Sequence, residues 1–164
     1  MHVNQSLANN YFDIICAFNA FYAFSNQTKA LSSLNRVAKL GAKQVIFDYA
    51  YQGSPHQCIL YRSGKDGRTP FIPISLNHID TMLQKTGWRL DDIIDVSDDY
   101  LRWYDNLLKT LHHRKNEVIL KFGKDAFLSA NATYTRIKRS LVTKNAYGSI
   151  VYAEKIKNIE DINI

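Results

Sequence analysis

The fold of this chain is decided by Phe12-Asp-Ile-Ile-Cys-Ala-Phe-Asn19 and, further along, by Gln44-Val-Ile-Phe-Asp-Tyr49. Both stretches are largely apolar, as in parallel strands that are covered on both faces. Between them, apolar side chains recur at helical spacing at Ala30, Leu31, Leu34, Val37 and Ala38. This order predicts a right-handed strand–helix–strand crossover with neighbouring strands. Both strands end in polar residues, which is where open α/β sheets bind their ligands.

The helix of this crossover is expected over residues 25–40, with Ser25 or Asn26 as its cap and Gly41 at its end. The next stretch predicts a loop over residues 52–73 that contains a short edge strand at 58–61. The remaining expected elements are helices over 75–86, 97–122 and 125–142, strands over 88–96 and 147–154, and a frayed tail after Lys157. Gly87 and Gly123 are expected to end two of these helices, and Ser97-Asp98-Asp99 to cap the longest one.

The composition is that of one folded domain. With 164 residues, 46% of them apolar, the chain can bury a substantial core. Its apolar stretches are too short to span a membrane, and residues 1–25 lack the pattern of a secretory signal. Cys16 falls in an expected buried strand and Cys58 in a loop, so we expect reduced thiols and a cytoplasmic protein.

Positive charge is concentrated in the second half of the chain. The net charge is +6, and the segment Arg102–Lys157 holds twelve Lys or Arg residues against four Asp or Glu. Such a segment is compatible with nucleic acid, with an anionic surface or with solvated helix faces. The cluster Arg136-Ile-Lys-Arg139 could contact phosphates, but no RNA-binding motif accompanies it. We therefore favour solvated helix faces and do not expect a nucleic-acid partner.

The order of elements resembles the C-terminal half of a class I S-adenosylmethionine-dependent methyltransferase of the small-molecule type. The stretches that carry the resemblance are Phe12-Asp13-Ile-Ile as the fourth strand of that fold, Leu34-x-Arg36-Val37-x-Lys39 in the next helix, Gly87-Trp88 before the sixth strand, and Tyr147–Lys155 as the antiparallel seventh strand. The resemblance implies a partial Rossmann-like α/β sheet over residues 1–157, with a helical pair inserted at about 97–143 and a tail at 158–164. The insertion is similar to those of methyltransferases that act on sarcosine and dimethylglycine.

The cofactor-binding part of that family has no counterpart in this sequence. No Gly-x-Gly occurs in the 164 residues, and no carboxylate stands near Val3 or Asn4, where the family often has an adenine contact. The chain is interpreted either as one piece of a split or truncated methyltransferase, or as a chain that completes its sheet by self-association. We expect a homo-oligomer or a missing N-terminal half as partner, because the 12–18 strand would otherwise leave an apolar edge unpaired.

The resemblance also implies where S-adenosylmethionine and the methyl acceptor would lie. Phe18 and Asn19 would lie beside the methionine part of the cofactor, while Tyr22, Tyr49 and Tyr51 would face the acceptor. Methyl transfer mainly requires alignment of the acceptor and exclusion of water. The alternative is that Asn19 caps the strand end and that Tyr22 is a core aromatic.

Further candidate residues follow from their chemistry. Asp48 could act as a general base or bind an ammonium group, or it could cap a turn. Tyr49, Tyr51, Trp103 and Tyr104 could form an aromatic surface for a methylated ammonium, or belong to the core. Arg102 could pair with a substrate carboxylate, or be a solvated charge. We expect no metal site, because the adjacent His112 and His113 point in different directions on a helix.

Three functions remain open at this stage. The first is methyl transfer to a small amine or carboxylic acid, by a chain that we expect to be inactive alone. The second is a non-catalytic half-domain that acts through self-association or a protein partner. The third is a basic RNA-binding module, whose binding would weaken steeply with salt.

Overall fold

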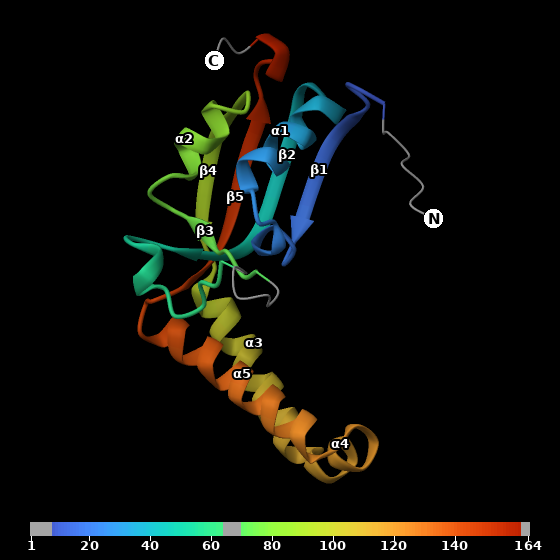
Figure 1. Ribbon diagram of the computed structural model, residues 1–164, viewed down its shortest axis with the longest axis vertical. Helices are drawn as coiled ribbons and strands as arrows, with labels where there is room; N and C mark the ends of the chain where they lie inside the picture. Colours follow the sequence, from blue (N-terminus) through green and yellow to red (C-terminus); the bar gives the residue numbers. More distant parts are fainter. Residues whose placement is uncertain (1–7, 64–69, 162–164) are drawn as a thin grey trace.

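The computed structural model describes residues 8–63 and 70–161. The expected loop residues 64–67 and the positions near Val3 and Asn4 lie outside the described residues. Within the described parts, a sheet with one helix-covered face carries a helical arm at one end (Figure 1). No described helix is both long enough and apolar enough to cross a membrane.

The sheet has the strand order β1-β2-β5-β4. Its strands are β1 (Phe12–Phe18), β2 (Ala38–Tyr51), β4 (Trp88–Asp95) and β5 (Tyr147–Lys155), and the two-residue β3 (Ile74–Ser75) pairs with the end of β2. β1 and β2 are parallel, whereas β5 runs antiparallel to both β2 and β4. The expected partial Rossmann-like sheet with an antiparallel final strand is confirmed.

The crossover between β1 and β2 contains α1 (Gln27–Val37). Asn26 caps this helix as predicted, because its side chain accepts a hydrogen bond from the Lys29 N–H at 2.8 Å. The predicted stop at Gly41 is wrong, since β2 begins at Ala38 and continues through Gly41. Gly41 has φ +81° and lies in a bulge of β2 where the β1–β2 register shifts. Its positive φ therefore belongs to this bulge and not to a helix end.

The segment between β2 and β4 differs most from the sequence prediction. The expected strand at 58–61 is absent from the described residues. The short helix η2 (Pro55–Gln57) precedes this stretch, and an isolated antiparallel β-bridge joins Arg62 to Phe71 after it. The buried side chains of Cys58 and Leu60 explain why this stretch looks strand-like in sequence. The following helix, α2 (Ile79–Gln84), is shorter than predicted, because residues 76–78 and 85–86 form turns and Ser75 belongs to β3.

The inserted helices form an arm that projects from the end of the sheet (Figure 1). The arm consists of α3 (Ser97–His113), α4 (Lys115–Phe122) and α5 (Lys124–Val142). The predicted single helix over 97–122 is interrupted at Arg114, and Gly123 ends α4 as expected. The predicted cap at Ser97-Asp98-Asp99 is wrong: the residue before the helix is Val96, and the Ser97 hydroxyl accepts a hydrogen bond from the Gly148 N–H instead.

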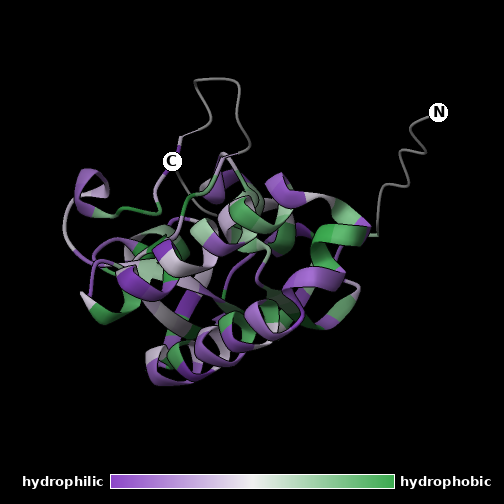
Figure 2. Ribbon diagram, turned by 90° about the horizontal axis from the view of Figure 1, so that it is seen from below, coloured by the Kyte–Doolittle hydropathy of each residue, from purple (hydrophilic) through white to green (hydrophobic). Residues whose placement is uncertain are grey.

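The arm helices are amphipathic, with hydrophilic and hydrophobic residues on each helix (Figure 2). Their inward side contributes Tyr100, Tyr104, Ile137 and Leu141 to a small core at the base of the arm. On the outward side, Lys138 pairs with Asp105 at 2.5 Å. Lys138 of the Arg136–Arg139 cluster therefore joins two helices of the arm.

The main core lies between the sheet and the two helices α1 and α2. Leu31 of α1, Leu83 of α2, Ile46 of β2 and Trp88 of β4 are fully buried there. The short helix η1 (Phe21–Ala23) adds the buried Phe21, and η3 (Ile159–Asp161) follows β5, in the tail that we expected to be frayed.

The other face of the sheet is largely uncovered away from the arm. We call it the open face; the strand register places on it Ile14, Cys16, Phe18, Val45, Ile94, Ile150 and Tyr152. Ile14 and Phe18 are 63% and 65% exposed, whereas Ile46 on the covered face is fully buried. Parallel strands are normally covered on both faces, whereas the exposed Ile14 and Phe18 show that β1 is covered on one face only within the described residues.

Candidate active site

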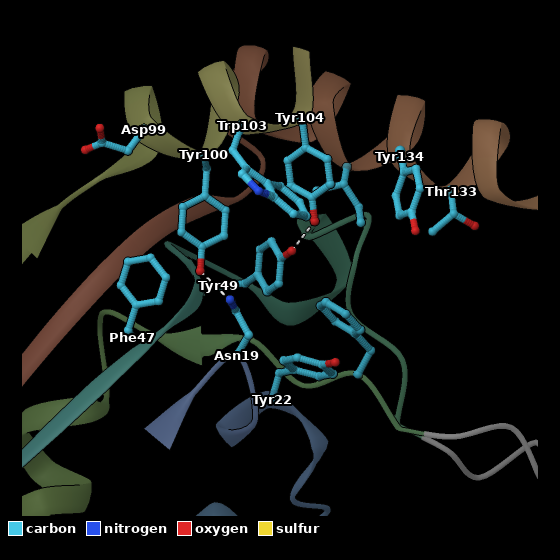
Figure 3. A pocket seen from close by; sticks show the side chains of 12 residues that line it. Asn19, Tyr22, Phe47, Tyr49, Asp99, Tyr100, Trp103, Tyr104, Thr133 and Tyr134 are labelled. Carbon is cyan, nitrogen blue, oxygen red and sulfur yellow. Dashed lines mark hydrogen bonds between the residues drawn. The ribbon is translucent and has the colours of Figure 1, made fainter. Parts of the chain in front are cut away.

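A cavity of about 560 Å³ lies where the ends of β1 and β2 meet the base of the arm (Figure 3). We call it the aromatic cavity, because eight of its twelve lining residues are Phe, Tyr or Trp. The lining residues are Asn19, Tyr22, Phe47, Tyr49, Phe71, Asp99, Tyr100, Trp103, Tyr104, Thr133, Tyr134 and Ile137. No Lys, Arg or His belongs to this set.

Two elements, β2 and α3, bring five of these side chains together through their own periodicity. Alternate residues of a strand face the same side, which turns Phe47 and Tyr49 of β2 toward the cavity. Residues three and four apart share a helix face, which does the same for Tyr100, Trp103 and Tyr104 of α3. The cavity is therefore closed only when the arm lies against the ends of the strands.

Two hydrogen bonds connect the arm to the strand ends across the cavity (Figure 3). The Tyr100 hydroxyl donates to Asn19 Oδ1 at 2.6 Å, and the hydroxyls of Tyr49 and Tyr104 are hydrogen-bonded to each other. Asn19 has φ +46°, and its N–H donates to the Phe47 carbonyl at 2.8 Å. Asparagine tolerates this left-handed conformation, so the turn after β1 is well defined.

Burial favours the neutral form of three of the cavity tyrosines. Loss of solvent raises the pKa of Tyr49, Tyr100 and Tyr104 above the ordinary tyrosine value. These phenols therefore serve as hydrogen-bonding groups and as aromatic faces. They are poor general bases at neutral pH.

The aromatic rings form one continuous wall. Tyr22 stacks on Phe71 with ring centroids 4.3 Å apart, and Phe71 lies 5.4 Å from Tyr49. Tyr49 in turn contacts the Tyr100 ring edge-to-face at 5.1 Å. Trp103 is 57% exposed, so its indole is available to a ligand at the cavity.

Comparison with known proteins identifies the fold. A candidate sarcosine dimethylglycine methyltransferase from Galdieria sulphuraria superposes with a TM-score of 0.79 at 14% identity, over 95% of this chain and 57% of that one. The phosphoethanolamine N-methyltransferase 2 of Haemonchus contortus gives 0.76 at 18% identity, over 92% and 35%. A cyclopropane synthase from Mycobacterium tuberculosis gives 0.77 at 14% identity, over 90% and 56%. This chain has a class I methyltransferase fold.

The methyltransferase fold is present here only in part. The chain spans between about a third and three fifths of the length of the three methyltransferase-fold structures described above. No protein-family model and no curated protein matches the sequence. The likeness thus comes from the arrangement of the elements and not from close sequence relatedness.

Within the methyltransferase fold, five of the nine predicted site residues meet in the aromatic cavity. They are Asn19, Tyr22, Tyr49, Trp103 and Tyr104. Phe18 lies just outside, with its ring 6.3 Å from that of Phe47 and its side chain on the open face. Tyr51 is buried against Tyr61, also outside the cavity lining.

Asp48 lies on the other side of β2 from the cavity. Its carboxylate accepts hydrogen bonds from the N–H groups of Tyr49 at 2.7 Å and Tyr22 at 3.0 Å, and the residue is fully buried. Burial raises the pKa of this carboxyl to about 6, although the backbone N–H groups oppose the shift. This geometry supports the turn-capping interpretation of Asp48, since neither oxygen faces the cavity.

Arg102 also lies apart from the aromatic cavity. Its guanidinium pairs with Asp99 one turn earlier on α3, and it lines a separate polar cleft with Ser97 and Lys144. The described residues contain no cluster of His, Cys, Asp or Glu that could hold a metal ion.

Sequence reasoning missed several wall residues of the cavity. Phe47 and Tyr100 come from elements that were predicted, and so do Thr133, Tyr134 and Ile137 of α5, whereas Phe71 comes from the predicted loop. The spacing of Tyr100, Trp103 and Tyr104 was an available signal for Tyr100. Nothing local to residues 133–137 indicates which side of α5 meets α3.

Proposed function

We propose that this chain forms the acceptor-binding part of an S-adenosylmethionine-dependent methyltransferase that acts on a small amine. The observation that carries the proposal is the aromatic cavity at the strand ends of a methyltransferase fold, which is where this class of sheet binds its ligands. The names of two similar structures refer to sarcosine and dimethylglycine and to phosphoethanolamine, which are amines or methylated amines.

An amine fits the cavity better than a carboxylic acid. Aromatic faces attract ammonium groups, by about 0.5–2 kcal/mol per ring depending on desolvation. The lining contains no cation to pair with a carboxylate, and Arg102 points to another cleft. Asp99 is the one carboxylate in the lining, and it is already paired with Arg102, so the aromatic faces carry the preference.

The residues of this chain would position the acceptor and exclude water. Trp103, Tyr104 and Tyr49 offer their ring faces, and the Tyr100–Asn19 hydrogen bond fixes the turn after β1. The Asp48 carboxylate stabilises the same turn by accepting a hydrogen bond from the Tyr22 N–H. Holding the reacting groups in line is the main contribution that a protein makes to methyl transfer.

The described residues fit S-adenosylmethionine only in part. When bound, this cofactor supplies an activated methyl group. Asn19 stands where the strand-end side of the cofactor site is expected, but its Oδ1 is already hydrogen-bonded to Tyr100. No Gly-x-Gly is present to let backbone approach the ligand. We therefore propose that the rest of the cofactor site belongs to a segment that is not part of this sequence, in the same or another polypeptide.

The open face supports this division. A further parallel strand beside β1 and helices over Ile14, Phe18 and Ile150 would complete the three-layer sheet. We propose the N-terminal half of the same fold as this partner. A second candidate function, a non-catalytic half-domain that associates through the open face, is favoured by the same exposed residues. The second function predicts that the chain associates with an identical copy of itself, whereas the first predicts association with the N-terminal half. For either function, we keep the cytoplasm as the proposed compartment.

The acceptor proposal is tested by calorimetric titration of the chain with choline and with its neutral analogue 3,3-dimethyl-1-butanol. We expect choline to bind at least tenfold more tightly, because only its charged head is attracted by the rings. Trp103→Leu should remove most of this preference, whereas Tyr11→Leu, which removes an equally exposed aromatic elsewhere, should retain it. Equal binding of the two compounds would contradict the proposal.

The cofactor proposal is tested with S-adenosylhomocysteine. We expect no detectable binding to the chain alone, and micromolar binding once a polypeptide that carries the first strand and a Gly-x-Gly turn is co-expressed with it. Binding to the chain alone, together with a dimeric mass in solution, would show that two copies rebuild the site and would refute the division proposed here.

A further inference from the structure

A second hollow lies along the arm and shares one lining residue, Tyr134, with the aromatic cavity. This hollow, of about 360 Å³, is lined by residues of all three arm helices, among them Leu107, Leu111, Val118, Phe122, Ala130 and Tyr134. We call it the arm groove. Tyr134 lines both spaces, and its ring lies 6.1 Å from that of Tyr104.

Helical periodicity shows that the two spaces share one side of the arm. On α3, Tyr104 of the aromatic cavity is followed on the same helix face by Leu107 and Leu111 of the arm groove. On α5, Ile137 and Tyr134 of the cavity are followed in the same way by Ala130. The groove therefore extends the cavity by roughly 15 Å, since the ten residues from Tyr104 to Arg114 each rise about 1.5 Å.

The chemistry changes along this path. The cavity end is mainly aromatic and has no cation in its lining, whereas the groove lining includes four aliphatic side chains, those of Leu107, Leu111, Val118 and Ala130. Charged residues, Arg114, Glu117 and Lys121, occur only at its far end, where Arg114 and Glu117 pair with each other. A ligand that matches both parts has an ammonium head and an unbranched apolar tail.

We infer that the methyl acceptor is an amphiphilic amine, whose head occupies the aromatic cavity and whose aliphatic tail lies along the arm groove. This inference rests on the proposed function and adds the substrate class. The tail would cover the half-buried side chains of Leu107, Leu111 and Val118 and remove them from water. Burial of such surface favours binding in proportion to the area covered.

The test is a calorimetric titration of the chain with n-alkyltrimethylammonium salts from butyl to decyl, each below its micelle-forming concentration. We expect the dissociation constant to fall with each added methylene, by up to about fourfold, and to level off when the tail reaches the end of the groove. A dissociation constant that is the same for butyl and decyl would overturn the inference. If no member of the series binds, the amine function itself fails.

The variant Ala130→Trp locates the tail. Its indole should fill the arm groove and abolish the gain from chain length, while butyltrimethylammonium still binds. Ala132→Trp is the matched control, because Ala132 is an exposed alanine of α5 outside the groove lining. Equal chain-length gains in the two variants would show that the tail lies elsewhere. If Ala130→Trp does not fold, Thr110→Trp blocks the groove from an exposed position on α3.

Decanoate serves as a second probe, since it carries the same tail on an anionic head. We expect decanoate to bind at least tenfold more weakly than decyltrimethylammonium. Equal binding of both, with the chain-length gain intact, would retain the groove but refute the ammonium preference. The decanoate comparison thus tests the ammonium preference, and the chain-length series separately tests whether the tail occupies the groove.

Discussion

At the scale of single residues, Asp48 shows how burial decides the role of a carboxylate. Sequence reasoning grouped Asp48 with Tyr49 as neighbours at a strand end. Successive strand residues face opposite sides, so the two cannot share one cavity, and the alternation alone could have shown this. The structure places Asp48 under the turn after β1, where it accepts backbone hydrogen bonds.

Asp48 makes stability depend on pH in a defined direction. Its folded-state pKa of about 6 exceeds the ordinary value of 3.8, so the folded protein binds the proton more tightly than the unfolded chain does. The resulting stabilisation is complete below about pH 4 and is lost as the pH rises through 6. The loss amounts to about 3 kcal/mol for a shift of this size.

We therefore expect the free energy of unfolding to fall more steeply between pH 4 and pH 7 in the unaltered protein than in Asp48→Asn. Urea denaturation at several pH values measures both slopes. The two proteins should be closest in stability near pH 4, where the Asp48 carboxyl is protonated. Parallel slopes across this range would show that Asp48 is ionised in the folded state as readily as in the unfolded chain.

At the scale of elements, the attachment of the arm to the sheet depends on one glycine. A Cβ on Gly148 of β5 would lie 2.5 Å from Cδ2 of Tyr100, so the ring of Tyr100 requires a residue without a side chain there. The same ring contacts Phe47 at 5.3 Å and carries the hydroxyl that reaches Asn19. Gly148 thus permits the contact that closes the aromatic cavity.

We expect Gly148→Ala to destabilise the protein by about 1–3 kcal/mol, because the Tyr100 ring must move away from the sheet. Choline binding should weaken at the same time, since the cavity wall moves with Tyr100. Thermal unfolding and calorimetry measure the two effects. The double variant Gly148→Ala with Tyr100→Ala should recover part of the stability; the absence of any recovery would mean that Gly148 is required for another reason.

The helices and strands were largely predictable from the sequence, whereas the tertiary contacts between them were not. The limits of β1 and the cap at Asn26 follow from local pattern, which depends on near neighbours in sequence. Gly41 was misread because a helix end and a strand bulge both use a positive φ. The contact between Asn19 and Tyr100 joins residues 81 positions apart, and no local pattern encodes it.

At the scale of the whole molecule, the open face should govern association. Exposed apolar patches of this kind mark interaction surfaces, and β1 adds an unpaired strand edge. In the absence of a partner, we expect the chain to self-associate in analytical ultracentrifugation. Ile14→Lys with Phe18→Lys should shift the distribution toward the monomer, because both side chains lie on that face.

Leu120→Lys is the matched control for this experiment. Leu120 is 90% exposed on α4, at the far end of the arm, and its replacement should leave the association unchanged. If Leu120→Lys produces the monomer and the double variant does not, the interface lies on the arm and the open face has no part in it.

The arm leaves and rejoins the sheet at a single place, where the Val96 N–H donates to the Gly148 carbonyl at 2.9 Å. Topologically, the arm is a very long loop of an otherwise ordinary hairpin between the antiparallel neighbours β4 and β5. Its length and sequence can therefore change without disturbing strand register. The sheet can therefore stay constant while the arm is exchanged, and under the proposed function a different arm inserted at this junction would change which ligand the aromatic cavity accepts.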